Sequence, residues 1–256
     1  MSALSALLEM SNSLLWQGFV VFLRIAAIAA LLPGFGEQSV PVRIKLVIAL
    51  AFTAIIVPAV SIPSFDLQFS SITFLVFTEC LSGVVLGIGL RLFVLALQTA
   101  GSIAAQSTSL SQVLGGASVD PLPAMGYILI VAGIALATMM GLHIKVAQLA
   151  ILSYDFLPIG RFLNGSELSE WGVRNVSSAF ALAFVLAAPF VILSVLYNFA
   201  LGAINRAMPQ LMVAFVGAPV ITLGGLALLF VSAPYMLSVW LSAMDNFLIN
   251  PFSTRQ

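Results

Sequence analysis

Long hydrophobic stretches without any charged residue dominate this sequence. Four of them contain 20, 24, 31 and 38 residues, and they lie between Lys45 and Asp66, Asp120 and Lys145, Arg174 and Arg206, and Arg206 and Asp245. A helix that crosses a bilayer needs about 20 predominantly apolar residues. Each stretch is therefore long enough to form a membrane-spanning helix.

The two longest stretches also contain helix-disrupting residues. Pro189 predicts a bend in the first of them, and Pro219 with Gly224-Gly225 predicts an interruption in the second. Two more hydrophobic segments, 14–32 and 72–97, are also long enough to form helices, although they contain charged residues. The pattern predicts an all-α integral membrane protein with about six long, partly kinked helices.

A polar stretch, 99–123, separates the hydrophobic segments. It is rich in Ser, Gln, Thr and Gly, and it ends in Asp120-Pro121-Leu122-Pro123. Such a composition cannot face lipid, because its polar groups need hydrogen-bonding partners. We expect a loop or re-entrant segment that is shielded by protein.

The composition agrees with a membrane protein. Of 256 residues, 61% are apolar and 7% are charged, whereas about a quarter of a typical soluble domain is charged. The net charge of +0 argues against a nucleic-acid partner, and a single cysteine, Cys80, excludes an internal disulfide framework. The N-terminus lacks the basic region of a secretory signal, so we expect the whole chain to be mature.

Three charges fall inside the predicted helices: Arg24, Glu79 and Arg91. Insertion of such a residue costs about 2.5–3.5 kcal/mol, so it normally faces protein or water. One interpretation is a proton or ion pathway. The interpretation that we favour is a structural pair, such as Arg24 with Glu79, or a contact with a partner subunit, because a relay usually needs several carboxylates.

Two other patterns indicate packing. Gly83 and Gly87 form a GxxxG spacing, with Gly89 following, and this lets two helices approach closely. Trp16, Trp171 and Trp240 fall near predicted helix ends, as in an interfacial aromatic belt.

No motif predicts catalysis. His143 is the single histidine, and no P-loop, HExxH or GxSxG motif occurs. Tyr154-Asp155 resembles half of an intramembrane aspartyl protease, but the second half is missing. We expect no enzyme activity, no cofactor and no metal site.

Three segments combine Gly, Pro and polar residues within hydrophobic sequence. The first contains Arg24, Pro33, Pro41 and Arg43; the second contains Gly101, Gln106, Asp120 and Pro121; the third contains Asn198, Gly202, Asn205, Arg206, Pro209, Gln210, Gly217 and Pro219. In this order and spacing they resemble the FliR family of flagellar export proteins and its injectisome relatives, the SctT group, over nearly the whole chain. The third segment is the most specific, whereas Gln106-Ser107-Thr108 stands where the family has Gln-Met-Gly.

The resemblance implies a structural pore subunit of the flagellar type III export gate, which passes unfolded substrates across the bacterial inner membrane. It implies assembly with FliP-like and FliQ-like subunits, and contact with FlhB-like and FlhA-like proteins in the basal body, partly above the bilayer plane. Residues 1–172 would be the FliP-like part. Residues 173–256 would form a FliQ-like helical hairpin that turns at 205–210.

The resemblance also gives the polar stretch a role as a plug that closes the resting pore. Its residues would be Gln106, Ser109, Gln112, Gly115, Gly116, Asp120 and Pro121, with Gly115-Gly116 as a hinge. The alternative is an ordinary loop buried between helices.

Two other functions remain open from the sequence. The chain could be the equivalent subunit of a virulence injectisome. It could also be a small-solute secondary transporter whose broken helices near Pro189 and Pro219 form the binding site, although no internal symmetry supports this.

Overall fold

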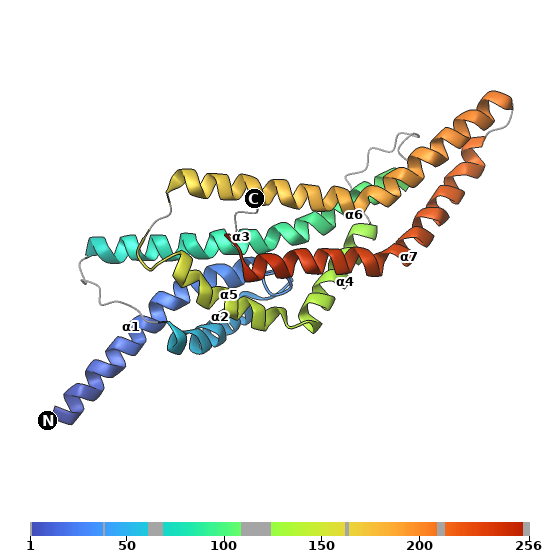
Figure 1. The fold of residues 1–256 in the computed structure, drawn as a ribbon. Helices are drawn as coiled ribbons and strands as arrows, with labels where there is room; N and C mark the ends of the chain where they lie inside the picture. The colour runs from blue at the N-terminus through green and yellow to red at the C-terminus, as the bar shows by residue number, and fades with distance from the viewer. Residues whose placement is uncertain are drawn as a thin grey trace. The chain divides into compact units, whose positions relative to one another are not determined.

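The protein is helical throughout the part that can be described. A computed structural model describes residues 2–37, 39–60, 69–108, 124–161, 164–208 and 213–252. Within these ranges lie α1 (Ser2–Leu31), α2 (Val42–Ile56), the short 3-10 helix η1 (Val57–Ala59), α3 (Phe69–Thr108), α4 (Ala124–Met139), α5 (Leu142–Phe156), α6 (Gly165–Ala207) and α7 (Val213–Ile249) (Figure 1).

Five helices in the described ranges are long and apolar enough to cross a membrane, and α4 with α5 makes a sixth if the pair is one broken span. No strand occurs in these ranges. The predicted class, an all-α membrane protein with about six long helices, is confirmed.

The predicted loop at 99–123 is wrong in its first part, because α3 continues to Thr108. The hydroxyl groups of Ser107 and Thr108 both donate to the carbonyl oxygen of Ala104, at 2.8 and 3.0 Å. A helix can therefore satisfy these polar side chains one turn back along its own backbone. Gln106 lies on this last turn of α3 and is exposed.

The predicted interruption at Pro219 and Gly224-Gly225 is also wrong. The α7 helix is continuous from Val213 to Ile249 and contains both Pro219 and Pro234, and α6 is continuous through Pro189. A proline removes one backbone hydrogen bond, and a long helix held by its neighbours tolerates that loss.

The chain breaks instead where no break was predicted, in the 24-residue stretch before Lys145. Gly141 has a φ of 81°, in the left-handed region that favours glycine, and it separates α4 from α5. At the N-terminus, α1 begins at Ser2 and so precedes the predicted start at residue 14.

The chain forms two compact units. Unit 1 comprises Met1–Arg91, Thr138–Val173 and Asp245–Gln256, and unit 2 comprises Leu92–Ala137 and Arg174–Met244. Each unit has its own buried apolar side chains, contributed by several helices.

In unit 1, glycines bring α1 and α3 into close contact. A Cβ atom at Gly83 would collide with the carbonyl oxygen of Arg24 and with the Cβ atom of Ala27, and one at Gly87 would lie 2.8 Å from the Cβ atom of Leu31. The GxxxG spacing of α3 thus packs against α1, and the close helix approach predicted from it is confirmed. The next glycine, Gly89, faces the ring of Phe247 in the same unit.

In unit 2, α3 crosses α4 at another pair of glycines. A Cβ atom at Gly101 would collide with the backbone of Gly126. The indole of Trp240 is fully buried, and its Nε1 donates to the carbonyl oxygen of Phe93 at 2.8 Å. The predicted place of Trp240 in an interfacial belt is therefore wrong, because its polar atom is satisfied inside the protein.

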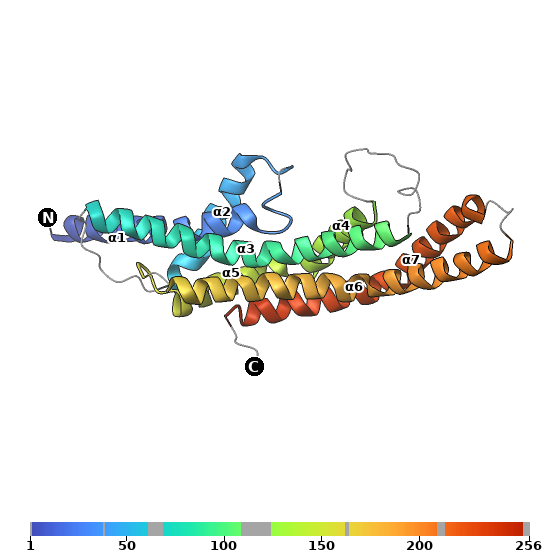
Figure 2. The same ribbon diagram turned by 90° about the horizontal axis from the view of Figure 1, so that it is seen from above.

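The parts of α6 and α7 that belong to unit 2, up to Met244, run side by side as a hairpin (Figures 1 and 2). Many of their large apolar side chains are exposed, including Phe199 at 82% and Phe230 at 85%. Such a surface is unsuited to water and fits lipid or protein neighbours.

We predict that Gly83→Ala lowers the stability of the protein, whereas Gly172→Ala does not. A Cβ atom at Gly83 forces α1 and α3 apart, which costs about 1–3 kcal/mol. Gly172 lies in α6, and an added Cβ atom there meets nothing within 4 Å, so the higher helix propensity of alanine stabilises slightly. Thermal unfolding of the detergent-purified variants measures the difference, and equal midpoints would contradict the close α1–α3 contact.

Candidate functional site

A buried arginine is the polar centre of unit 1. Arg24 of α1 is 0% exposed, and its guanidinium makes four hydrogen bonds. Nε and Nη2 donate to the two carboxylate oxygens of Glu79 in α3, at 2.9 and 3.1 Å. Nη1 donates to Ser153 Oγ in α5 at 3.0 Å, and Nη2 also donates to the carbonyl oxygen of Leu157 at 2.8 Å. We call this group the Arg24 cluster.

The Arg24 cluster joins four parts of unit 1. Glu79 is fully buried and also accepts a hydrogen bond from the backbone N–H of Gly160, at 3.4 Å. The guanidinium carbon of Arg24 lies 3.9 Å from the centre of the Tyr154 ring, a cation–π distance. Helices α1, α3 and α5 and the segment after α5 are thereby held at one point.

The structure contains the Arg24–Glu79 pair that we favoured over a proton pathway. A guanidinium has five N–H donors and a carboxylate about four acceptor sites, and most of both sets are used within the cluster. A carboxylate held this way is suited to fixing helices. Asp155, the next residue after Tyr154, is exposed and takes no part in the cluster.

The other predicted intramembrane charge, Arg91, pairs with a residue that the sequence did not single out. Its Nη1 donates to Glu37 Oε1 at 2.5 Å, and the two side chains are 36% and 29% exposed. Glu37 belongs to the turn between α1 and α2. Lys45 of α2 also reaches this turn, since its Nζ donates to the carbonyl oxygen of Gly36 at 2.9 Å.

The first family segment runs from Arg24 in α1 through this turn to Arg43 in α2. Pro33 is buried just after α1, and Gly34 has a φ of 81°. Pro41 immediately precedes α2 with a φ of −57°, the value its ring imposes, and Arg43 is exposed in the first turn of α2. These residues reverse the chain between two helices of unit 1.

The third family segment lies on the α6–α7 hairpin of unit 2. Tyr197 Oη donates to the carbonyl oxygen of Gly217 at 2.6 Å, and a Cβ atom at Gly217 would lie 2.8 Å from that hydroxyl oxygen. Asn198 Nδ2 donates to Ser194 Oγ at 3.2 Å within α6. Gly217 is therefore needed where α6 and α7 approach, and Pro219 is exposed two residues later.

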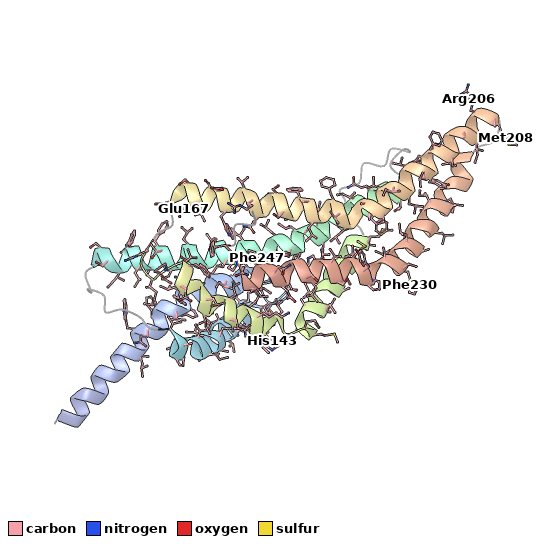
Figure 3. The ribbon with its side chains drawn as sticks, viewed as in Figure 1. His143, Glu167, Arg206, Met208, Phe230 and Phe247 are labelled. Carbon is pink, nitrogen blue, oxygen red and sulfur yellow. The ribbon has the colours of Figure 1, made fainter. Side chains whose placement is uncertain are left out.

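The end of the hairpin carries the polar part of this segment. Gly202, Asn205 and Arg206 are exposed in the last turns of α6, where a cation is favoured by the helix dipole. Arg206 and Met208 lie at the very end of the hairpin in Figure 3. Pro209 and Gln210 lie outside the described residues.

Most of the predicted plug also lies outside the described residues. Ser109, Gln112, Gly115, Gly116, Asp120 and Pro121 fall in the interval 109–123. Of the predicted set, Gln106 alone is described, on the last turn of α3.

Several residues of the site escaped the sequence analysis. Ser153, Leu157 and Gly160 of the Arg24 cluster are distant from Arg24 in sequence, and two of them contribute backbone atoms. The useful signal was the donor count of arginine, because one buried carboxylate cannot accept all five N–H groups. Among the described residues, no three His, Cys, Asp or Glu side chains are grouped so that they could hold a metal ion.

We predict that Arg24→Met destabilises the protein by about 3–5 kcal/mol, because it leaves the buried Glu79 carboxylate uncompensated. The double variant Arg24→Met/Glu79→Leu should be more stable than Arg24→Met alone. The control is Arg91→Gln, whose partly exposed pair with Glu37 is worth about 1 kcal/mol or less. Thermal unfolding and membrane yield measure these changes, and a double variant less stable than either single variant would contradict the pairing.

Comparison with known proteins identifies the family. Residues 15–247 match the family described as bacterial export proteins, family 1. The chain is 32% identical to the flagellar biosynthetic protein FliR of Caulobacter vibrioides, in an alignment that covers 86% of this chain and 90% of that protein. It is 30% identical to FliR of Escherichia coli, with 84% of each chain covered.

A more distant relative extends over more of the chain. FliR of Bacillus subtilis is 25% identical over 90% of this chain and 93% of its own. The resemblance deduced from the three sequence segments is thus confirmed. This chain belongs to the bacterial export protein family that includes FliR.

Proposed function

We propose that this protein is a structural pore subunit of the flagellar type III protein export gate and passes unfolded substrates across the inner membrane. The observation that carries the proposal is the family match over residues 15–247, supported by FliR relatives aligned along 84% or more of this chain. The apolar helices of the described residues fit a membrane component of the flagellum. The inner membrane and the basal body are its proposed location.

The proposed role is structural and involves no covalent chemistry. Its support is the bonding of the Arg24 cluster, whose groups hold helices together. We propose no enzyme activity and no cofactor.

The proposed partners are FliP-like and FliQ-like subunits, with FlhB-like and FlhA-like proteins in the same apparatus. In this proposal residues 1–172 are the FliP-like part and residues 173–256 the FliQ-like hairpin. The exposed apolar surfaces of α6 and α7 support it, because they leave large side chains such as Phe184, Phe199 and Phe230 available to neighbouring subunits.

The proposed plug comprises the residues from Gln106 to Pro121, and it would close the resting pore. Its support is the polar composition of this interval, which adjoins α3 and α4 in a chain that is otherwise hydrophobic. Opening would be a rearrangement of this segment, with Gly115-Gly116 as the hinge.

The flagellar apparatus is favoured over a virulence injectisome because the relatives from Caulobacter vibrioides, Escherichia coli and Bacillus subtilis are all flagellar proteins. A secondary transporter with broken helices is disfavoured, because α6 and α7 are continuous through Pro189 and Pro219.

We expect this chain to form a stable complex with FliP-like and FliQ-like proteins from the same bacterium. The measurement is the native mass and stoichiometry of the tagged, detergent-purified chain, produced with and without these partners. A monomer or homodimer that ignores the partners and binds a small solute would contradict the gate and favour a transporter.

The plug has its own test. We predict that deletion of residues 110–119 makes the reconstituted complex leaky to ions, because the resting pore loses its closure, while the complex still assembles. Conductance of the reconstituted complex measures the leak, and Gly172→Ala serves as a control. A deletion complex as tight as the wild type would rule out a plug in this segment.

A further inference from the structure

Unit 1 contains a pocket that the export role does not explain. It has a volume of 560 Å³ and is lined by Lys145, Gln148, Ile151 and Leu152 of α5 and by Asp245, Leu248 and Ile249 of α7. Binding sites for small molecules typically measure about 300–1,000 Å³ and combine apolar walls with a few polar groups. We call it the α5–α7 pocket; in Figure 3, His143 and Phe247 mark the two helices that line it.

The pocket has a charged end and an apolar end. Lys145 Nζ donates to both carboxylate oxygens of Asp245, at 2.7 and 2.8 Å, and the two side chains are 30% and 31% exposed. Beyond this ion pair the lining is Gln148 and then the apolar Ile151 and Leu152 on α5, and the apolar Leu248 and Ile249 on α7. Along α5 the lining extends about 10 Å from Lys145 to Leu152, at 1.5 Å per residue. An amphipathic ligand matches this layout.

The ion pair selects a ligand that carries both charges. Lys145 uses two of its three N–H donors on Asp245, so one remains for an anion. The Asp245 carboxylate has about four acceptor sites and retains room for a cation. Because the pair is neutral as a whole, a purely anionic or purely cationic ligand gains less than a zwitterion.

The helix ends strengthen this preference. Lys145 lies in the first turn of α5, near the positive end of that helix, and Asp245 lies near the negative end of α7. Each side chain thus faces a dipole end of its own sign, so a further counter-charge beside each is favourable.

The walls distinguish between kinds of zwitterion. None of the described residues that line the α5–α7 pocket is aromatic, whereas quaternary ammonium groups such as choline are recognised by aromatic cages. A zwitterionic lipid with a primary ammonium can donate hydrogen bonds from that group to Asp245. The phosphate of the same lipid can accept hydrogen bonds from Lys145 and Gln148.

We propose that the α5–α7 pocket binds a phosphatidylethanolamine molecule from the membrane. The ammonium lies at Asp245, the phosphate lies at Lys145 and Gln148, and an acyl chain lies on Ile151, Leu152, Leu248 and Ile249. The Lys145–Asp245 pair stays intact in the complex. All the lining residues belong to this chain, so lipid binding can be measured without the proposed partners.

The test is native mass spectrometry of the full detergent-purified chain, titrated with palmitoyl-oleoyl phosphatidylethanolamine, phosphatidylcholine or phosphatidylglycerol. We expect the first phosphatidylethanolamine to bind about tenfold more tightly than the other two, the effect of one charge-assisted hydrogen bond. The neutral pair Lys145→Gln/Asp245→Asn should lose this preference. Equal affinities for the three lipids would overturn the proposal.

Two further variants test whether the lipid preference depends on this pocket or is lost whenever an ion pair of unit 1 is removed. Leu152→Trp fills the apolar end and should weaken phosphatidylethanolamine binding without touching the ion pair. Glu37→Gln/Arg91→Gln removes an ion pair of similar exposure elsewhere in unit 1 and should keep the lipid preference. A preference lost in this control, or kept in Leu152→Trp, would contradict the assignment.

A measurement in cells does not depend on any neutralised variant. A photoreactive amino acid at position 152, in the chain assembled with its partners, should form an adduct with lipid. A protein adduct at that position would overturn the proposal and identify the pocket as a subunit interface. Assembly is scored on the same sample, so failure of the lipid site is distinct from failure of the export gate.

Discussion

The packing of unit 1 depends on the burial of one guanidinium group. A charged Arg24 inside an apolar protein is tolerable only if its donors are satisfied and its charge is neutralised. Glu79, Ser153 and the Leu157 carbonyl meet the first demand, and Glu79 meets the second. These acceptors come from α3, α5 and the segment after α5. The helices must therefore take one register, because any sliding would leave a buried charge uncompensated.

Glycine makes this arrangement sterically possible. The guanidinium can reach Glu79 while α1 and α3 touch because Gly83 leaves room for the Arg24 carbonyl, and Gly87 leaves room for Leu31. Unit 2 uses the same device at Gly101 with Gly126 and at Gly217 beside Tyr197. Hydrophobic helices in an apolar environment gain little from burial alone, so close backbone contact and buried hydrogen bonds specify their pairing.

The polar groups of unit 1 differ in solvent exposure and in how many of their hydrogen-bond donors and acceptors remain unused. The Arg24 cluster is closed to solvent and uses most of its bonding capacity, which suits a fixed support. The Lys145–Asp245 pair is about one-third exposed and keeps free donors and acceptors beside an apolar pocket. The first arrangement explains how a protein with 7% charged residues holds its helices in register. The second leaves a place where a ligand can bind without breaking the pair.

The sequence by itself determined the helical membrane class, the family and the close packing at Gly83 and Gly87, because hydrophobic length and small-residue spacing are local properties. It also pointed to Arg24 and Glu79, since an intramembrane charge needs a partner. It misplaced the breaks at Pro219 and Thr99, because neighbouring helices decide whether a proline or a polar turn stays helical. Only the tertiary structure could bring Ser153, Leu157 and Gly160 to Arg24, or Lys145 to Asp245, since these contacts join segments far apart in the chain.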